Sequence, residues 1–202
     1  MSKRLRYQVA VSLDGFIATP DGGYDWIVDD PAIDFKALAR EFDTAVAGRK
    51  TYDLMASQGQ VGMPGLEFVV FSRTLAPMEK RGLRIVDEDP ARVVAELKKG
   101  KGRDIWLFGG GEMLRTLLDA GLVDSVELAV MPVLLGAGIP VLSPGAAAKL
   151  VLSDMKRLPK SGIVFLAYAV EGATAPPPRI RYVKKTRSAR SKTRGARKSR
   201  KR

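Results

Sequence analysis

Three short segments of the chain bring glycines, hydroxyl groups and cations together in a way that suits phosphate binding. They are Gly48-Arg49-Lys50-Thr51, Ser72-Arg73-Thr74 and Gly109-Gly110-Gly111-Glu112. Glycine lets the backbone approach a ligand closely, and the start of a helix directs free N–H groups and a positive dipole end at an anion. Helices are expected to start within the first and third segments, so these two starts could hold the two ends of a pyrophosphate.

The cations in these segments indicate which nucleotide would bind. Arg49, Lys50 and Arg73 are fixed positive charges, and an arginine beside a hydroxyl suits the 2′-phosphate of a ribose. The combination favours NADPH over NADH. Taken singly, each segment could be an ordinary loop and each arginine a solvated surface residue. Three such segments at successive strand ends favour a binding site, because ligands collect at the carboxyl ends of strands in open α/β sheets.

Two residue types that carry much of enzyme chemistry are absent. The 202 residues include no cysteine and no histidine. This excludes disulfides, a thiolate nucleophile, Ser-His arrangements and the commonest transition-metal ligands. We therefore expect no metal site, and any chemistry must use carboxylates, hydroxyls, lysine, backbone groups or a borrowed cofactor.

Apolar runs predict the strands that would position the three segments. They lie at residues 5–11, 44–47, 68–71, 83–86, 105–108, 125–130 and 163–170. Short apolar strands separated by helical patterns indicate an α/β fold with a mostly parallel central sheet that helices cover on both faces. No comparable helix separates the last two of these runs, so we expect an antiparallel C-terminal edge.

The helices are predicted from the spacing of apolar residues and from capping signals. Phe35, Leu38, Ala39 and Phe42 fall at i, i+3, i+4 and i+7, on one face of a helix. A second helix follows the glycine segment from Met113 and is expected to stop at Gly121. A third is predicted after Asp89-Pro90, where an N-cap residue precedes a proline in the first helical position.

The charge is divided unequally along the chain. Residues 179–202 hold 13 of the 34 lysines and arginines and none of the 22 acidic residues, which leaves the remainder at a net charge of −1. Three consecutive prolines, residues 176–178, precede this stretch and favour a stiff, extended spacer. We therefore predict one domain over residues 1–173, followed by a proline-rich linker and a disordered basic tail over residues 174–202.

The sequence shows no clear targeting signal for export or for insertion into a membrane. The apolar stretch near the start is interrupted by Gln8, Ser12 and Asp14, too early for a signal-peptide core. The longest apolar run, residues 128–142, is broken by prolines and glycines and is shorter than the roughly 20 residues of a membrane span. We expect a cytoplasmic protein that does not enter a membrane.

The order of these motifs resembles that of a known family. The three segments look like the cofactor-binding turns of dihydrofolate reductases, and the closer resemblance is to the C-terminal reductase domain of the bacterial riboflavin-biosynthesis deaminase–reductase (RibD). Further motifs of that group are Ser12-Leu13-Asp14-Gly15 and the Pro-x-x-x-Gly-x-Gly pattern of residues 132–138. Gly23-Tyr24-Asp25-Trp26 is similar to its stand-alone members. The resemblance spans roughly residues 5–170 and does not include a zinc deaminase half.

The resemblance implies a dihydrofolate-reductase-like fold that binds NADPH across the sheet. The nicotinamide would lie near Val9, Ala10 and the Gly109 turn. The expected reaction is hydride transfer to a small heterocycle, either pterin-like or 5-amino-6-ribosylaminouracil-like. The family also implies homodimers, and the apolar strand from Val126 to Val133 could pair across one.

Dihydrofolate reductases anchor the pterin with a carboxylate that also relays a proton, and four aspartates are candidates here. They are Asp14, Asp25, Asp30 and Asp34. Asp14, at the end of the first strand, is the preferred catalytic residue. Its alternative role is to form a turn with Gly15.

Four further residues are candidates for substrate contact or for scaffold. Asp25 would bind substrate, and Trp26 could wall a heterocycle by stacking or belong to the core. Pro132 and Gly136 could contact a substrate phosphate, or could turn the chain at a sheet edge.

Two other functions remain open at this stage. Residues 179–202 could neutralise several phosphates and give weak, salt-dependent binding to nucleic acid or another polyanion. Tyr182 is the only aromatic residue beyond the prolines, so base stacking has little support. The folded part could alternatively be an inactive or ligand-sensing relative of the reductases.

Overall fold

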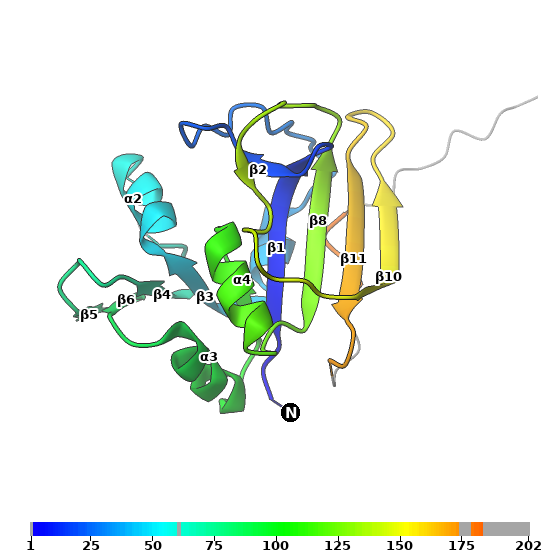
Figure 1. Cartoon of the computed structure of the whole chain (residues 1–202). Helices are drawn as coiled ribbons and strands as arrows, with labels where there is room; N and C mark the ends of the chain where they lie inside the picture. Colours follow the sequence, from blue (N-terminus) through cyan, green and yellow to red (C-terminus); the bar gives the residue numbers. More distant parts are fainter. Residues whose placement is uncertain (1, 60–61, 174–178, 184–202) are drawn as a thin grey trace, which may run out of the picture.

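One large sheet organises the chain. The computed structural model describes residues 2–59, 62–173 and 179–183. Nine strands form the sheet in the order β10-β11-β8-β1-β7-β3-β4-β6-β5, and β2 pairs with β9 in a small second sheet (Figure 1). The strands are β1 (Leu5–Ser12), β2 (Phe16–Ala18), β3 (Phe42–Gly48), β4 (Glu67–Phe71), β5 (Met78–Lys80), β6 (Leu83–Val86), β7 (Asp104–Leu107), β8 (Ser125–Met131), β9 (Ile139–Pro140), β10 (Leu150–Arg157) and β11 (Val164–Val170).

The predicted mixture of parallel and antiparallel pairing is confirmed. The six strands from β8 to β6 in the sheet order run parallel to their neighbours. β11 is antiparallel to β8, and β10 is antiparallel to β11. β5, which the apolar runs did not predict, adds a short antiparallel strand at the other edge.

Four helices in the described part of the chain flank this sheet: α1 (Phe35–Ala39), α2 (Arg49–Ser57), α3 (Pro90–Lys99) and α4 (Gly111–Asp119). The capping signals are confirmed. The Asp89 carboxylate accepts a hydrogen bond from the Arg92 N–H at 2.9 Å, with Pro90 in the first helical turn. Gly121 follows the C-cap of α4 with a φ of +66°, in the left-handed region that favours glycine.

The two faces of the sheet carry separate hydrophobic clusters. On one face, α3 and α4 pack Val94, Leu114 and Leu117 against β1 and β7, and both helices lie in front of the sheet in Figure 1. On the other face, α1 and the aromatic residues Phe42 and Trp106 form the second cluster. The helical cover of this face consists of the five-residue α1 and of α2, whose Tyr52 and Met55 pack against the cluster. No helix in the described ranges is both long and apolar enough to cross a membrane.

The second face also buries an ion cluster. Arg6 on β1 is 1% exposed, and its guanidinium donates two 2.8 Å hydrogen bonds to the Glu127 carboxylate on β8. It donates a third, at 2.7 Å, to Glu41 and lies over the Phe42 ring, 4.6 Å from its centroid. These partners satisfy the buried charges, and removing one of them would leave an uncompensated ion.

A segment expected to be disordered lies in the core instead. In residues 179–183, which we call the docked segment, Ile180 and Tyr182 are each 2% exposed, whereas Arg179 and Arg181 are exposed. This alternation of arginine with apolar residues is that of a strand with one buried face. The expected disorder is therefore wrong for these five residues. Residues 174–178 and 184–202, to which the rest of that prediction refers, lie outside the described part of the chain.

The docked segment crosses the second face from the sheet edge to α1. The Ile180 N–H donates to Asp154 on β10 at 3.0 Å, and Lys156 donates to the Ile180 carbonyl. At the other end, the Asp34 N–H donates to the Tyr182 carbonyl at 2.7 Å, and Val183 forms an antiparallel bridge with Ile33. The segment thus covers part of the face that the short α1 leaves open.

Two other expectations differ from the structure. Phe42 belongs to β3 and not to the helical face predicted for it, because α1 ends at Ala39 and the buried Phe42 ring stacks on Trp106 with centroids 5.1 Å apart. The strand from Val126 to Val133 cannot pair across a dimer as proposed. β8 lies inside the sheet, where β1 and β11 occupy its two edges.

Candidate functional site

The three glycine- and cation-bearing turns meet at one edge of the sheet. They follow β3, β4 and β7, which are neighbours and run parallel, so their carboxyl ends lie together. α2 and α4 both begin at this edge (Figure 1). This arrangement is the one in which α/β sheets bind nucleotides.

The start of α2 is a helix terminus without a side-chain cap. Gly48 is the N-cap in extended conformation and, as a glycine, has no side chain to accept a hydrogen bond from the first turn. A β-carbon at Gly48 would lie 3.9 Å from the terminal methyl group of Met113, in the first turn of α4. The two helix starts are therefore close neighbours, and both present backbone N–H groups.

The start of α4 is built from glycines for two different reasons. Gly109 and Gly110 have φ values of +82° and +71°, which side chains other than glycine rarely adopt. Gly111 has ordinary backbone angles but no space. A β-carbon there would lie 2.6 Å from the Pro140 carbonyl oxygen and 3.0 Å from the Ser143 nitrogen. The end of β9 and the residues that follow it are thus packed directly on the first turn of α4.

The predicted cationic and hydroxyl groups are brought together only in part. Arg49 donates to the Thr74 hydroxyl and forms a 3.1 Å ion pair with Asp53, so the first two turns are in contact. The buried Ser72 hydroxyl accepts a hydrogen bond from the Leu75 N–H at 3.0 Å and thereby shapes the second turn. Lys50 and Arg73 are exposed.

The two remaining predicted cofactor residues of the helix starts have different environments. Thr51 packs on the glycine turn, because its hydroxyl would lie 3.0 Å from a β-carbon at Gly109. Glu112 is exposed in the first turn of α4. A carboxylate there interacts favourably with the helix dipole but opposes a phosphate at the same terminus.

At this edge β1 extends beyond the end of its neighbour β7. The last pair between the two strands is Tyr7 with Leu107, after which β7 turns away through Gly109. Val9 and Ala10 lie beyond that pair and are half-buried, packed against opposite clusters. The indole nitrogen of Trp106 donates to the Gln8 carbonyl at 3.0 Å, in place of a strand partner.

Asp14 connects two loops at the same edge. Its carboxylate accepts hydrogen bonds from the Ser12 hydroxyl at 2.6 Å and from the N–H groups of Gly136 and Leu135 at 2.7 and 3.1 Å. These bonds, with that from Ser12 the strongest, lower the pKa of Asp14 to about 2. Asp14 is therefore fully ionised near neutral pH and holds the loop after β8 against the end of β1.

The other candidate aspartates divide into structural and exposed groups. The Asp34 side chain caps α1 by accepting from the Ala37 N–H at 2.9 Å. Asp30 is buried and accepts from the Ala32 N–H at 2.9 Å, a bond that lowers the pKa of its carboxyl. Asp25 is exposed on the loop between β2 and α1.

The loop that carries Asp25 reaches to the end of α2. Tyr24 donates a hydrogen bond to Gln58, the C-cap residue of α2. Trp26 is half-buried against the second-face cluster, and its indole donates to the Gly23 carbonyl at 3.3 Å. The loop between β2 and α1 is thus held at the C-terminal end of α2 by Tyr24 and against the cluster by Trp26.

Pro132 and Gly136 belong to the loop that follows β8. Pro132 is exposed and lies against Gly162, while Gly136 has a φ of +73° and donates to Asp14. A β-carbon at Gly138 would lie 2.3 Å from the Ala18 carbonyl oxygen, so the loop is packed closely on β2. The structure thus gives this loop a definite scaffolding role at the site.

Sequence reasoning missed Gln8 and Tyr182. The Gln8 amide nitrogen donates to the Tyr182 hydroxyl at 2.6 Å, across the buried face of β1. The polar Gln8 interrupting an apolar strand, and the apolar alternation of residues 180–183, were signals that could have found them.

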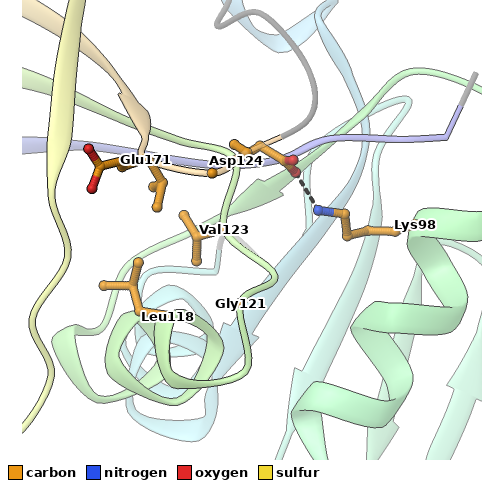
Figure 2. A pocket seen from close by; sticks show the side chains of 9 residues that line it. Lys98, Leu118, Gly121, Val123, Asp124 and Glu171 are labelled. Atoms are coloured by element: carbon orange, nitrogen blue, oxygen red, sulfur yellow. Dashed lines mark hydrogen bonds and ion pairs between the residues drawn. The ribbon is translucent and has the colours of Figure 1, made fainter.

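A hollow of about 260 Å³ lies away from this edge (Figure 2). It is lined by Leu118, Gly121, Val123 and Glu171, with the ion pair of Lys98 and Asp124 at one side. Asp124 directly precedes β8, so the hollow lies at the amino ends of the parallel strands, opposite the three turns. Both of its paired charges have protein partners, since Lys98 also donates to the Leu122 carbonyl and Asp124 accepts from the Leu5 N–H.

The sheet order, the antiparallel C-terminal edge and the three turns define a dihydrofolate-reductase-like α/β fold. The profile of the RibD C-terminal domain family matches residues 3–163. The chain therefore belongs to the RibD C-terminal domain family.

Two bacterial relatives are similar over most of their length. YyaP of Bacillus subtilis (strain 168), an uncharacterized protein, is 32% identical over 151 residues, which cover 69% of this chain and 80% of YyaP. YwjB of the same strain, also uncharacterized, is 30% identical over 146 residues, covering 70% of this chain and 83% of YwjB.

Solved structures share the fold at lower identity. A putative riboflavin biosynthesis protein from Shewanella sp. PV-4 has a TM-score of 0.71 and 22% identity, covering 85% of this chain and 99% of that one. The diaminohydroxyphosphoribosylaminopyrimidine deaminase/5-amino-6-(5-phosphoribosylamino)uracil reductase of Thermotoga maritima has a TM-score of 0.63 and 14% identity. The match to it covers 84% of this chain and 57% of that enzyme.

Proposed function

We propose that this protein is an NADPH-dependent reductase that transfers a hydride to a small heterocycle, pterin-like or 5-amino-6-ribosylaminouracil-like. Membership of the RibD C-terminal family supports a reductase-like domain. The observation that carries the proposal is the convergence of three phosphate-suited turns at the carboxyl ends of β3, β4 and β7. One of the structural relatives is named as a 5-amino-6-(5-phosphoribosylamino)uracil reductase, which motivates the substrate class.

The residues at the edge fit a dinucleotide. Gly109 and Gly110 carry no side chains over the start of α4, and Gly48 leaves the start of α2 without a side-chain cap. The N–H groups of these two helix starts would hold the pyrophosphate. Arg49, Arg73 and Thr74 would bind the 2′-phosphate and so select NADPH over NADH. When bound, NADPH supplies the hydride.

The protein's own residues would then orient the two reactants. Val9 and Ala10, beyond the last β1–β7 pair, are the proposed floor for the nicotinamide. Asp14 is proposed as a positioning residue, because an ionised carboxylate that accepts three hydrogen bonds is a poor proton donor. The exposed Asp25, with Trp26 as a stacking wall, becomes the candidate for substrate contact on the facing loop.

Steady-state turnover tests the proposal. The full chain is incubated with NADPH and, in turn, dihydrofolate and ribosylamino-uracils, and loss of the reduced cofactor is followed by absorbance. We expect oxidation with at least one heterocycle and an increased KM for NADPH in Lys50→Ala. Lys36→Ala, which removes an exposed lysine from α1, is the matched control and should leave KM unchanged. No oxidation with any member of either class would contradict the reductase assignment.

We also propose a homodimer, which the family resemblance supports. The outer strand β10 carries apolar side chains that are unusually exposed, namely Leu150, Leu152 and Met155 at 40, 52 and 61%. A second copy seated on this strand would cover them. Static light scattering gives the molar mass in solution, and a monomer at all concentrations would contradict this assembly.

A further inference from the structure

One buried polar group in the described residues has no partner. Gln8 on β1 is 8% exposed, and its amide oxygen is buried without any hydrogen bond from the described part of the chain. The amide nitrogen is engaged, at 2.6 Å from the Tyr182 hydroxyl. If the amide is turned over, the oxygen meets Tyr182 and the nitrogen loses its partner, so either orientation leaves half of the amide unsatisfied.

Such a group is costly to keep. Leaving a buried donor or acceptor without a partner costs the full desolvation of that group, whereas an apolar side chain of similar shape would avoid this cost. Native structures therefore have few unsatisfied groups of this kind, and each one calls for an explanation. An incoming ligand that supplies the missing hydrogen bond is one such explanation.

The position of Gln8 relates it to the proposed site. It is the first residue of β1 after the last pair with β7, where the sheet opens beside the Gly109 turn. By strand alternation it lies on the same face as Ala10, about 7 Å further back along β1. The separation is about the width of one heterocyclic ring. A substrate ring placed next to a nicotinamide that is seated on Ala10 would therefore lie at Gln8. The half-buried Trp26 and Phe108 pack against the same cluster.

We propose that the Gln8 amide recognises the lactam edge of the substrate's heterocycle, that is, a ring N–H beside a carbonyl. A primary amide matches such an edge because it offers one donor and one acceptor side by side. A lactam N–H would supply the hydrogen bond that the amide oxygen lacks. The inference rests on the proposed function for its substrate class, and it selects within that class the heterocycles that retain a lactam N–H.

Tyr182 acts in this arrangement as a positioning residue. Its hydroxyl fixes one end of the Gln8 amide, and its ring packs edge-on to Phe165 with centroids 5.6 Å apart. The backbone beside it is held to α1 by the Asp34 N–H at 2.7 Å. The docked segment, which continues into the basic stretch of the sequence, thus orients the Gln8 amide on the substrate side of the proposed site.

Binding of simple probes to the full chain tests this inference without any turnover. The probes are uracil and uracil methylated on both ring nitrogens, which has the same carbonyls but no N–H donor. We expect uracil to shift the Gln8 side-chain NH₂ resonances in NMR spectra and to bind at least about tenfold more tightly than its dimethyl form, the size of one hydrogen bond to a buried partner. Gln8→Leu should abolish this preference.

The variants separate positioning from stability. Tyr182→Phe keeps the ring against Phe165 and should weaken uracil binding several-fold while the protein stays folded. Tyr168→Phe, on the opposite face of the sheet, is the matched control and should bind as the wild type does. Equal binding of the two probes, unshifted Gln8 resonances, or undiminished uracil binding by Gln8→Leu would overturn the inference. NADPH titration of the same samples tests the proposed function separately, since the three turns do not include Gln8.

Discussion

Asp14 shows how a residue suited to proton transfer can instead hold a loop in place. Its carboxylate accepts from Ser12, Leu135 and Gly136, which join the end of β1 to the loop after β8. The same contacts explain both its lowered pKa and the closeness of the two loops. A proton relay needs a pKa near the working pH, and Asp14 lies far below it.

We predict that the Asp14 carboxyl titrates with a pKa of about 2, against its ordinary value of 3.8. Because the folded pKa is depressed, the stabilising contribution of Asp14 is complete above about pH 4 and is lost as the pH falls through about 2. NMR titration of the side chain measures the midpoint, and the amide protons of Leu135 and Gly136 should shift with the same midpoint. An ordinary midpoint, or amides that do not follow it, would show that these hydrogen bonds do not persist in solution.

At the scale of elements, the site depends on how two helices begin. α2 starts at Gly48, which has space for a side chain, whereas α4 starts under a segment that leaves Gly111 none. The two glycines look equivalent in the sequence. Their roles differ because the segment after β9 packs on one helix start and not on the other.

We predict opposite behaviour for the two alanine variants. Gly111→Ala forces a β-carbon against the Pro140 carbonyl and should lower the free energy of unfolding by about 1–3 kcal/mol. Gly48→Ala should change it by no more than about 1 kcal/mol, the usual scale for an N-cap exchange, yet weaken NADPH binding roughly tenfold by crowding the phosphate. Denaturant unfolding and cofactor titration measure the two effects. The account fails here if Gly48→Ala is the less stable variant or binds NADPH normally.

The sequence allowed most elements of this edge to be predicted, but not the contacts between distant elements. Strands such as β4 and β6 were predicted because both faces are buried, which makes them continuous apolar runs. β10 was not predicted, because it lies at the sheet edge with its apolar residues exposed. Its sequence therefore lacks the alternation of apolar and polar residues that one buried face would produce. Phe42 fitted a helical spacing, yet its stacking on Trp106 placed it in β3. Gln8 could be recognised as a site candidate only once Tyr182 was seen against it.

At the scale of the whole molecule, the boundary between domain and tail differs from the change in composition. Charge and proline place the boundary before residue 179, but the docked segment returns to the sheet and buries Ile180 and Tyr182. A five-residue α1 leaves room on that face, and the segment fills it. Basic residues are therefore not a reliable sign of where the folded part ends.

We predict that truncation after residue 183 leaves stability unchanged within error, whereas truncation after residue 178 lowers it by several kcal/mol. The second truncation removes the buried side chains of Ile180 and Tyr182, and the burial of each contributes about 1.5–3 kcal/mol to the free energy of unfolding. It also removes the hydroxyl partner of Gln8. Denaturant unfolding of the two proteins compares them directly. Equal stability would mean that the docked segment does not hold to the sheet in solution.

The measurement that tests the central claim most directly is titration of NADPH and NADH into the full chain, followed by tryptophan fluorescence. If the three turns form one cofactor site, NADPH binds saturably and at least about tenfold more tightly than NADH, the scale of a hydrogen-bonded charge pair. Arg73→Ala should remove most of that preference, while Arg81→Ala, an exposed arginine on the turn between β5 and β6, should retain it. Absence of saturable binding by either nucleotide, or equal binding of both, would contradict the assignment of the turns to NADPH.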